Sequence, residues 1–441
     1  MELDIGLPLP VRLDVGDSGL LQWREAPGGA IPTSYVLQAV RSGEAEVEIR
    51  LFGAIPLRRI HVQVLPRVGL VPGGQSVGVL LHSRGVLVTG LGVVTDAEGR
   101  RHRPAERAGL RPGDVLLAVD GQPVDTELEV EELIQEAGRE RREMRMQVKR
   151  GSRTLTVRLR PVRCGETGRY RVGLYIRDGA CGVGTLTFWH PNSLVYGALG
   201  HVVADAATSF PLEVGEGRIV RARVSGIQQG RRGHPGEKIG VFVHDLDVIG
   251  TIDKNTPFGI FGRLFREPEG LYREPLPVAL ARQVREGPAQ MVTVVEGDRC
   301  EVFDVVVERA LPQKRPAAKG LVIRVTDADL LARTGGIVQG MSGSPLIQGG
   351  MIIGAVTHVF LNDPTRGYGV YAEWMLEACG LLSGSYQPEA RAVMSTNCRK
   401  AYPLSTDCAA GSSRYSVESL VAHHGRRGGW AALDQDQADG R

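Results

Sequence analysis

The sequence predicts a mainly β protein with several domains, and three observations indicate this. The chain has 441 residues, enough for two or three separate hydrophobic cores. Its 58 glycines and 25 prolines, together with only 5% aromatic residues, indicate many turns between short strands. Segments that alternate apolar and polar residues greatly outnumber helical patterns. No run of 18 apolar residues occurs, so we expect no membrane-spanning helix within these residues.

Residues 1–71 are expected to form a small N-terminal β-rich region. Ala45–Leu51 and Ile60–Val64 alternate apolar and polar side chains, as half-buried strands do. Residues Gly53 to Pro56 supply a turn between these two strands. The pattern assigns no chemistry to this region.

Residues 72–162 carry the pattern of a second, compact module. Pro104 is suited to begin a short helix and Gly109 to end it, and Asp120-Gly121 is typical of a tight turn. Apolar residues at helical spacing predict an amphipathic helix over Glu127–Ala137, and Thr154–Leu159 alternates as a closing strand. The segment Pro104–Val124 closely resembles the central part of bacterial PDZ domains.

PDZ domains bind a peptide as an added strand, with its carboxylate held by backbone amides. The glycine-rich segment before the first strand is the expected binding loop, and the strand that follows it the expected free edge. The predicted peptide-binding residues are Gly74, Gln75, Ser76, Val77, Gly78 and Val79. The alternative is a PDZ fold that only packs against its neighbour.

Residues 163–385 contain many short strand-like runs separated by glycines, which predicts a pair of antiparallel β-barrels. These runs are Gly182–Phe188, Ile219–Ile227, Gly240–Val243, Met291–Val295, Val302–Val307 and Ile352–Val359. Residues 386–441 are polar and rich in small side chains, so a disordered tail is expected.

The most informative motif is Gly340-Met341-Ser342-Gly343-Ser344-Pro345. This Gly-x-Ser-Gly-x-Pro pattern is the frame that chymotrypsin-like serine peptidases build around their nucleophile. A serine hydroxyl is a weak nucleophile and needs a rigid backbone beside a general base. The N–H groups of Gly340 and Ser342 would form the oxyanion hole. The alternative is an ordinary Gly/Ser-rich turn between two strands.

His201 is the first candidate for the general base, because a small-residue turn, Gly197 to Gly200, delivers it at the edge of an apolar segment. His244 competes, since the carboxylate of Asp245 beside it could tune its pKa. His358 follows the serine closely on the next strand and is expected to pack.

The acid must accept the imidazole N–H and stabilise the imidazolium. Asp245 and Asp247 lie about midway between His201 and Ser342, and this spacing alone favours Asp245. Asp327 precedes the serine by fifteen residues and is the other candidate.

Several further segments resemble the SpoIVB peptidases of endospore-forming bacteria. These are Gly200-His201, Gly250–Gly262, and the stretch from Thr334 to Trp374 that includes Gly354–Thr365 and Gly367–Val370. The resemblance implies a catalytic triad of His201, Asp327 and Ser342, and so moves the acid from Asp245 to Asp327. The order of PDZ before peptidase also differs from that in the HtrA proteases.

The resemblance further implies a signalling role during sporulation. Family members cleave themselves and then cut a regulatory membrane protein, which triggers sigma-factor precursor processing. They act in the space between the forespore and mother-cell membranes, and the PDZ domain is thought to bind the target or the enzyme's own N-terminus. The family carries an N-terminal export segment that is absent from the given residues, so we expect a start upstream or a truncated chain.

The sequence also argues against several other functions. No dense basic run with aromatic residues occurs, which excludes a nucleic-acid partner. The six cysteines form no CxxC pair, and His423-His424 lacks further ligands, so no metal site is predicted. The predicted chemistry requires no cofactor. Two other functions stay open: a PDZ adaptor on an inactive peptidase-like scaffold, and a quality-control protease of broad specificity.

Overall fold

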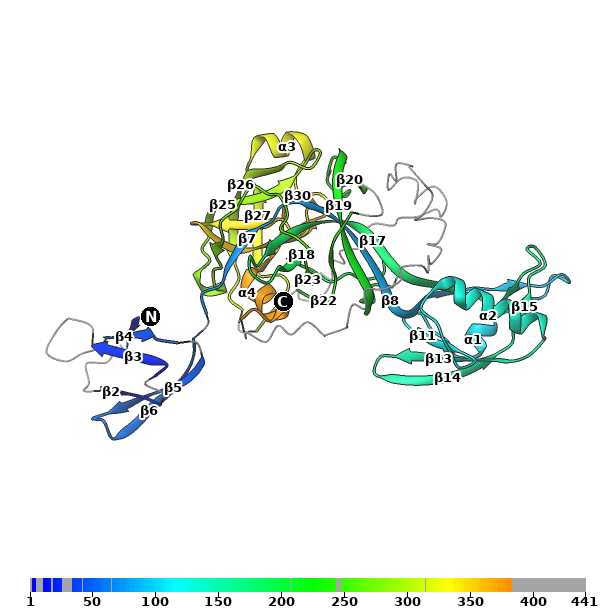
Figure 1. The fold of residues 1–441 in the computed structure, drawn as a ribbon, viewed down its shortest axis with the longest axis horizontal. Helices are drawn as coiled ribbons and strands as arrows, with labels where there is room; N and C mark the ends of the chain where they lie inside the picture. Colours follow the sequence, from blue (N-terminus) through cyan, green and yellow to red (C-terminus); the bar gives the residue numbers. More distant parts are fainter. Residues whose placement is uncertain are drawn as a thin grey trace. The chain divides into compact units, whose positions relative to one another are not determined.

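The computed structural model describes residues 2–4, 11–16, 19–25, 34–41, 43–64, 66–206, 208–242, 247–313 and 315–382. The chain divides into two compact units, residues 1–68 and residues 69–441 (Figure 1). The structure is mainly β, as the sequence predicts. The expected disordered tail at 386–441 lies outside the described residues.

The first unit contains two three-stranded antiparallel sheets. One sheet has the order β1 (Glu2–Asp4), β4 (Ser34–Ala39), β3 (Leu21–Glu25), and the other has the order β2 (Val11–Val15), β5 (Gly43–Leu51), β6 (Ile55–Val64). Val47 is fully buried in the core of this unit and Leu13 is 5% exposed. The two predicted strands are confirmed as β5 and β6, but the turn between them lies at residues 52–54, so Ile55 and Pro56 of the predicted turn belong to β6.

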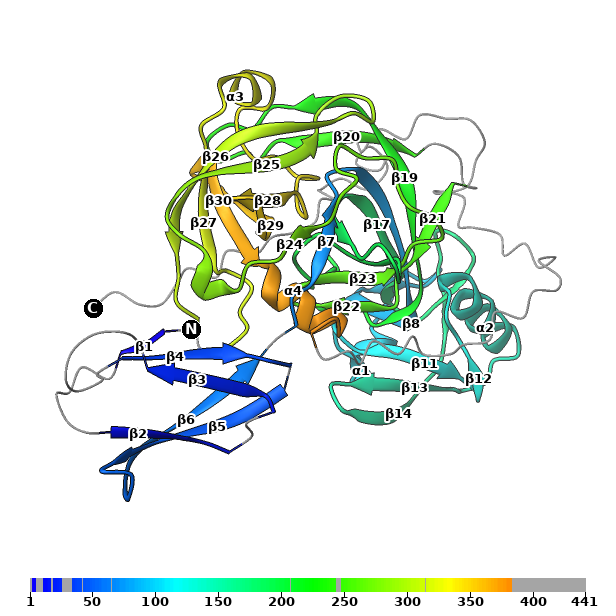
Figure 2. The same cartoon turned by 60° about the vertical axis from the view of Figure 1, so that its left-hand side comes forward.

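The second unit contains a closed six-stranded barrel (Figure 2). The Gly-x-Ser-Gly-x-Pro motif leads into one of its strands. Around the barrel, its strands are β25 (Gly287–Val294), β26 (Cys300–Ala310), β27 (Leu321–Val325), β30 (Asp363–Tyr371), β29 (Met351–Phe360) and β28 (Pro345–Gln348). Inward-facing apolar residues such as Met291, Val307 and Ile323 are fully buried. The motif lies between α3 (Ala328–Thr334) and β28, so it enters the barrel at a strand end.

A second set of strands forms a half-barrel with its own core around Val79, Leu186 and Tyr196. Its strands are β7 (Gly69–Pro72), the first half of β8 (Ser76–Leu91), the second half of β17 (Leu174–Trp189), β18 (Val195–Ala198), β19 (Val214–Gln228), β20 (Glu237–Phe242), β21 (Val248–Thr251), β22 (Lys254–Thr256), β23 (Gly259–Arg263) and β24 (Leu276–Pro277). The 3-10 turn η1 (Ala281–Gln283) and the helix α4 (Ala372–Cys379) complete the peptidase part, and α4 contacts strands of both barrels.

The PDZ domain has a separate core in which Val86, Leu116 and Met146 are fully buried. Its elements are the second half of β8, β9 (Val94–Thr95), β10 (Arg101–His102), α1 (Pro104–Arg107), β11 (Val115–Val119), β12 (Gln122–Pro123), α2 (Glu127–Arg139), β13 (Met144–Arg150), β14 (Arg153–Leu159), β15 (Val162–Arg163), β16 (Tyr170–Arg171) and the start of β17. A capping box closes the start of α2: the Thr126 hydroxyl accepts from the Glu129 N–H, and the Glu129 carboxylate accepts from the Thr126 N–H. Both predicted helices are present.

The two long strands β8 and β17 belong to both the PDZ domain and the half-barrel (Figure 1). They pair over Leu174–Arg177 within the PDZ domain and again over Gly179–Thr185 within the half-barrel. The PDZ domain is therefore an insertion in a hairpin of the peptidase, whereas the sequence predicted a PDZ domain at 72–162 and a peptidase at 163–385. The difference arises because β8 and β17 each pass from one core into the next within a single strand, so the domain boundary does not coincide with a strand end.

This arrangement corrects the predicted peptide-binding edge at residues 74–79. Val77 and Val79 are buried in the half-barrel, where β8 pairs with β17 on one side and with β19 on the other. The Gly73 and Gly74 amides already donate to the carbonyls of Thr187 and Leu186. Neither a free strand edge nor a set of free loop amides remains there for a peptide.

No helix among the described residues is long and apolar enough to cross a membrane.

The insertion predicts that the peptidase part folds without the PDZ domain. Residues 84–177 can be replaced by an Asn-Gly turn, because His82 and Gly179 pair directly and Ser83 Oγ donates to the Asp178 carbonyl at 3.1 Å. Leu87 is lost from the half-barrel core, which costs about 2 kcal/mol and lowers Tm by roughly 5 °C. Thermal unfolding followed by circular dichroism measures this, and a shortened chain without a cooperative transition would contradict the insertion.

Candidate active site

Two positions of the nucleophile turn, residues 338–344, have a backbone conformation that only glycine adopts readily. Gly340 has φ +90° and Gly343 has φ +95°, both in the left-handed region. A Cβ on Gly343 would lie 2.1 Å from the Thr185 carbonyl oxygen. The two glycines of the motif therefore allow a tight turn that lies against β17.

Ser342 is held from both barrels. Its carbonyl accepts the Thr185 N–H of β17 at 2.9 Å, and the next amide, that of Gly343, donates to the Val356 carbonyl of β29 at 2.8 Å. The Ser342 hydroxyl donates to the Thr357 carbonyl at 2.7 Å. In this resting arrangement the nucleophile is bonded to a backbone carbonyl, and a rotation about its Cα–Cβ bond is needed before attack.

The amides of Gly340 and Ser342 donate to no acceptor among the described residues, whereas Met341 and Ser344 donate within the turn. Two nearby amides that are left without intramolecular partners are the arrangement required for an oxyanion hole. The predicted roles of Gly340 and Ser342 are consistent with this geometry.

His201 follows a turn in which Leu199 and Gly200 have positive φ angles of 68° and 71°. Its Nδ1 lies 2.8 Å from the Val202 carbonyl oxygen. A carbonyl can only accept, so Nδ1 carries the proton and Nε2 is left with the lone pair of a general base. Burial lowers the pKa of His201 below its ordinary value, while the bond to Val202 acts in the opposite direction.

The His201 turn, the nucleophile turn and β29 meet at one place. A Cβ on Gly200 would lie 2.9 Å from Thr357 Cγ2, and one on Gly343 would lie 2.5 Å from the Leu199 nitrogen. The ring of His201 lies 5.3 Å from that of His358, the residue after the carbonyl that binds Ser342. The structure thus brings Ser342 and His201 into one region, although no hydrogen bond joins them in this resting arrangement.

His358 packs beside His201, as the sequence predicts. Burial and the neighbouring His201 and Lys319 lower the pKa of His358 to about 3, so this imidazole is neutral at ordinary pH. Its Nδ1 is buried without a partner among the described residues. A neutral ring here adds no positive charge that would oppose proton uptake by His201.

The structure does not bring Asp327 to His201. The Asp327 carboxylate caps α3 by accepting the Leu330 N–H at 2.9 Å, and it also accepts the Asp304 N–H at 3.3 Å. These two bonds give the Asp327 carboxylate a structural task that competes with a catalytic one. Its role as the acid stays a prediction. The competing candidates Asp245 and His244 lie outside the described residues.

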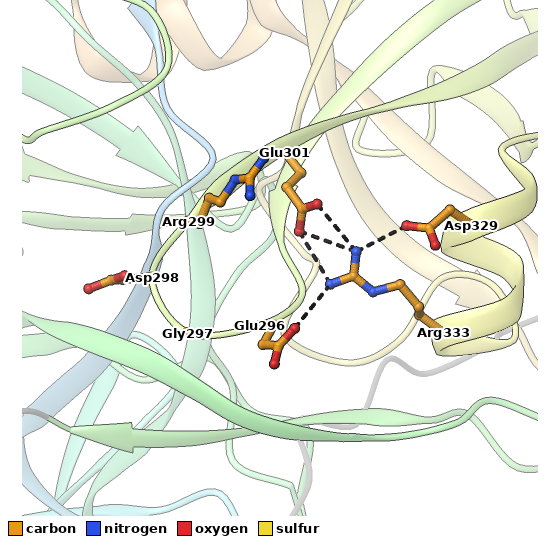
Figure 3. Close-up of a pocket in the computed structure, with 7 residues that line it drawn as sticks. All are labelled: Glu296, Gly297, Asp298, Arg299, Glu301, Asp329 and Arg333. Atoms are coloured by element: carbon orange, nitrogen blue, oxygen red, sulfur yellow. Dashed lines mark hydrogen bonds and ion pairs between the residues drawn. The ribbon is translucent and has the colours of Figure 1, made fainter.

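A polar pocket of about 420 Å³ lies between α3 and the turn that joins β25 to β26 (Figure 3). Arg333 of α3 makes ion pairs there with Glu301 at 3.3 Å and with Asp329 at 3.0 Å. None of the predicted catalytic residues lines this pocket. The ion pairs of Arg333 anchor α3, the helix that leads into the nucleophile turn.

Sequence reasoning missed three groups that shape the site: the Val202 carbonyl, the Thr357 carbonyl and Thr185. Backbone carbonyls leave no trace in residue identity, so no signal could have revealed the first two. Thr185 lies within a predicted strand, but its contact with the turn depends on pairing across more than 150 residues of sequence. No group of metal-ligating side chains occurs in the part of the chain that the structure describes.

Comparisons with known proteins identify both domains. The sequence profile described as SpoIVB peptidase S55 matches residues 168–376, and a PDZ domain profile matches residues 96–150. No curated protein matches the chain.

Among solved structures, 13 chains match. The Rv3671c protease from M. tuberculosis in its active form is 17% identical, with a TM-score of 0.29 over 47% of this chain and 77% of that one. An inactive form carrying a serine-to-alanine mutation is 15% identical, with a TM-score of 0.28 over 47% of this chain and 83% of that one.

Three variants of Asp327 separate capping from catalysis. Serine is also a good N-cap, so Asp327→Ser should keep stability, whereas Asp327→Ala should lose about 1 kcal/mol. If the carboxylate only caps α3, kcat/KM of Asp327→Ser equals that of the wild type. A fall of about 10⁴-fold in Asp327→Ser and Asp327→Asn, with Tm unchanged in the serine variant, would instead establish Asp327 as the acid. Peptide hydrolysis and thermal unfolding provide the two readouts.

The lowered pKa of His201 sets the acid limb of the pH profile. The imidazole must be neutral to accept a proton, and its burial keeps it neutral below the ordinary histidine pKa of about 6.5. We expect kcat/KM not to decline as pH falls through this value, but only at lower pH. A half-maximal point above pH ~6.5 would contradict a buried base.

Proposed function

Because the peptidase domain of this chain belongs to the SpoIVB peptidase S55 family, we propose that this serine peptidase cleaves itself and then acts as a signalling protease in sporulation. Its target would be a regulatory membrane protein that restrains sigma-factor precursor processing. The observation that supports a serine-peptidase mechanism is that the His201 turn lies against the nucleophile turn, which carries Ser342 and two amides without an acceptor among the described residues.

In the proposed mechanism, the Ser342 hydroxyl first leaves the Thr357 carbonyl and turns towards Nε2 of His201. His201 takes its proton as Oγ attacks the scissile carbonyl, and the Gly340 and Ser342 amides hold the oxyanion. His201 then gives the proton to the leaving amine, and water completes hydrolysis by the same steps in reverse. The bond from Nδ1 to the Val202 carbonyl keeps the imidazole in the required tautomer throughout.

The resting position of Ser342 favours a regulated enzyme over one of broad specificity. A nucleophile that donates to a backbone carbonyl at 2.7 Å must lose that bond before it can act. β17 is one strand that runs from the PDZ domain, through a register shift between Arg177 and Gly179, to Thr185, which contacts the nucleophile turn. A ligand on the PDZ domain could thus bias the turn through this strand, provided that it shifts β17 between two arrangements.

The proposed location is the space between the forespore and mother-cell membranes, where a membrane-protein target and the enzyme's own N-terminus would both be accessible. The PDZ domain would bind peptide termini there, at a site other than residues 74–79, whose strand edges are occupied.

Self-processing provides the direct test. Purified wild-type protein should shorten from its N-terminus on incubation, whereas Ser342→Ala should stay intact, because loss of the nucleophile removes several orders of magnitude in rate. Intact mass spectrometry measures both. Equal trimming in both proteins would identify a contaminant or another nucleophile and would contradict the proposal.

Unfolded casein serves as the matched substrate control. Self-cleavage with little casein degradation supports a signalling peptidase, and rapid casein degradation would favour a quality-control protease. If neither substrate is cut, while a peptide still binds to the PDZ domain, an adaptor on an inactive scaffold becomes the better description.

A further inference from the structure

Lys238 is a buried lysine beside the nucleophile turn that the mechanism above does not use. It lies on β20 and is only 1% exposed, which places it among the largest fully buried side chains of the described protein. Gly236 and Gly240, two residues away on either side, face the same way and are also buried. The strand therefore turns a lysine inwards, where an apolar side chain is the usual choice.

The ammonium of Lys238 lies within a cluster of buried hydroxyls. Nζ donates to Thr293 Oγ1 of β25 at 2.8 Å, and Thr185 Oγ1 of β17 lies 3.4 Å away. Ser344 Oγ of the nucleophile turn donates to the same Thr293 oxygen at 2.9 Å. Thr185, Thr293 and Ser344 are all completely buried. One cation thus joins both barrels to the turn.

The same residue fixes the oxyanion donors in three ways. Its own amide donates to the Gln339 carbonyl at 2.9 Å, and its stem lies 3.1 Å from the position that a Cβ on Gly340 would take. The Thr185 hydroxyl donates to the Gly340 carbonyl at 2.8 Å. Because the Lys238 ammonium donates to the lone pairs of Thr185 Oγ1, the hydroxyl proton of Thr185 points to the Gly340 carbonyl oxygen. The carbonyl of Gly340 is held on the Thr185 side of the turn.

The ammonium makes no ion pair with a carboxylate among the residues that the structure describes. β17, β25 and the nucleophile turn present hydroxyls to it, and the Cys300 thiol of β26 is the titratable group that interacts with it, which would stabilise the ammonium only as a thiolate. Burial raises the pKa of that thiol to about 11, so it is neutral at ordinary pH, and Asp298 acts on the thiol in the same direction. An unpaired buried cation is costly to keep, so it invites a functional explanation.

We propose that Lys238 is a positioning residue for the peptidase reaction. It holds the Gly340 and Ser342 amides in the conformation that binds the oxyanion and places a positive charge behind them. This inference rests on the proposed mechanism at Ser342. It goes further in assigning the shape of the oxyanion hole to a side chain outside the motif.

The first test is Lys238→Met, which keeps the length of the stem and removes the charge and all three donors. We expect kcat for a peptide ester to fall about 10²-fold with KM little changed, as when an oxyanion donor is lost. Tm should stay level or rise, because the change removes a buried charge. Lys149→Met, on the PDZ strand β13, is the matched control and should keep wild-type kcat.

A pH profile adds a readout that a purely structural lysine would not move. Burial lowers the pKa of Lys238 to about 7. Above that pH the amine is neutral and can accept from Thr185, which releases the Gly340 carbonyl. We therefore expect wild-type kcat to decline as pH rises through 7, and Lys238→Met to lack this decline. A kcat of Lys238→Met within threefold of the wild type, with the alkaline decline unchanged, would overturn the proposal.

If Lys238→Met does not fold, Thr185→Val and Thr185→Ser carry the test. Valine removes the hydroxyl that binds the Gly340 carbonyl and should lower kcat, whereas serine keeps it and should restore most of the rate. Equal rates in both would overturn the inference.

Active sites are counted by fluorophosphonate labelling of Ser342. Hydrolysis that persists in Ser342→Ala would overturn the proposed mechanism and this inference together. A rate that is lost in Ser342→Ala but unchanged in Lys238→Met would overturn this inference alone.

Discussion

The proposed active site depends on two hydrogen bonds from one residue, Thr185. Its amide donates to the Ser342 carbonyl and its hydroxyl donates to the Gly340 carbonyl. These bonds join the half-barrel strand β17 to the turn that precedes β28 of the closed barrel. Without them the two carbonyls would be free to rotate, and the amides that should face an oxyanion would lose their common direction. The geometry of the proposed site is therefore a property of the interface between two cores and does not belong to the motif alone.

Such an interface needs polar groups where apolar packing would otherwise be more stable. Thr185, Thr293, Ser344 and Lys238 are all buried between the barrels, and each has a hydrogen-bond partner there. A hydroxyl network of this kind fixes one arrangement, because any shift leaves buried donors unsatisfied. Lys238 also makes stability depend on pH. Its pKa is lower in the folded state than in the unfolded chain, so it contributes stability above pH ~10, and this is lost as pH falls through 7.

Local patterns in the sequence predicted the elements and the nucleophile motif well, but they could not reveal pairings between distant segments. Alternation placed β5, β25 and β29, and the spacing of Gly340, Ser342 and Gly343 marked a turn that the structure confirms. The segment at residues 74–79 had the glycines and the apolar strand of a binding edge. Its true neighbours, β17 and β19, lie about 100 or more residues further along the chain. A central strand and an edge strand have the same alternation, so only the tertiary structure separates them.

Asp327 and Lys238 illustrate the same limit for side-chain roles. An aspartate three residues before a helical leucine is suited to a cap, and its carboxylate accepts two backbone amides here. The sequence could not rank this role against catalysis, because both use the same oxygens. The buried residues around β20 are every second one: Gly236 just before the strand, then Lys238 and Gly240 within it. A lysine at such an inward-facing position is the one local signal that was available in the sequence. An inward-facing charged residue in a predicted barrel is therefore a reason to search for a functional site beside it. Burying an unpaired charge destabilises the fold through its desolvation cost, so selection would remove such a residue if it had no function.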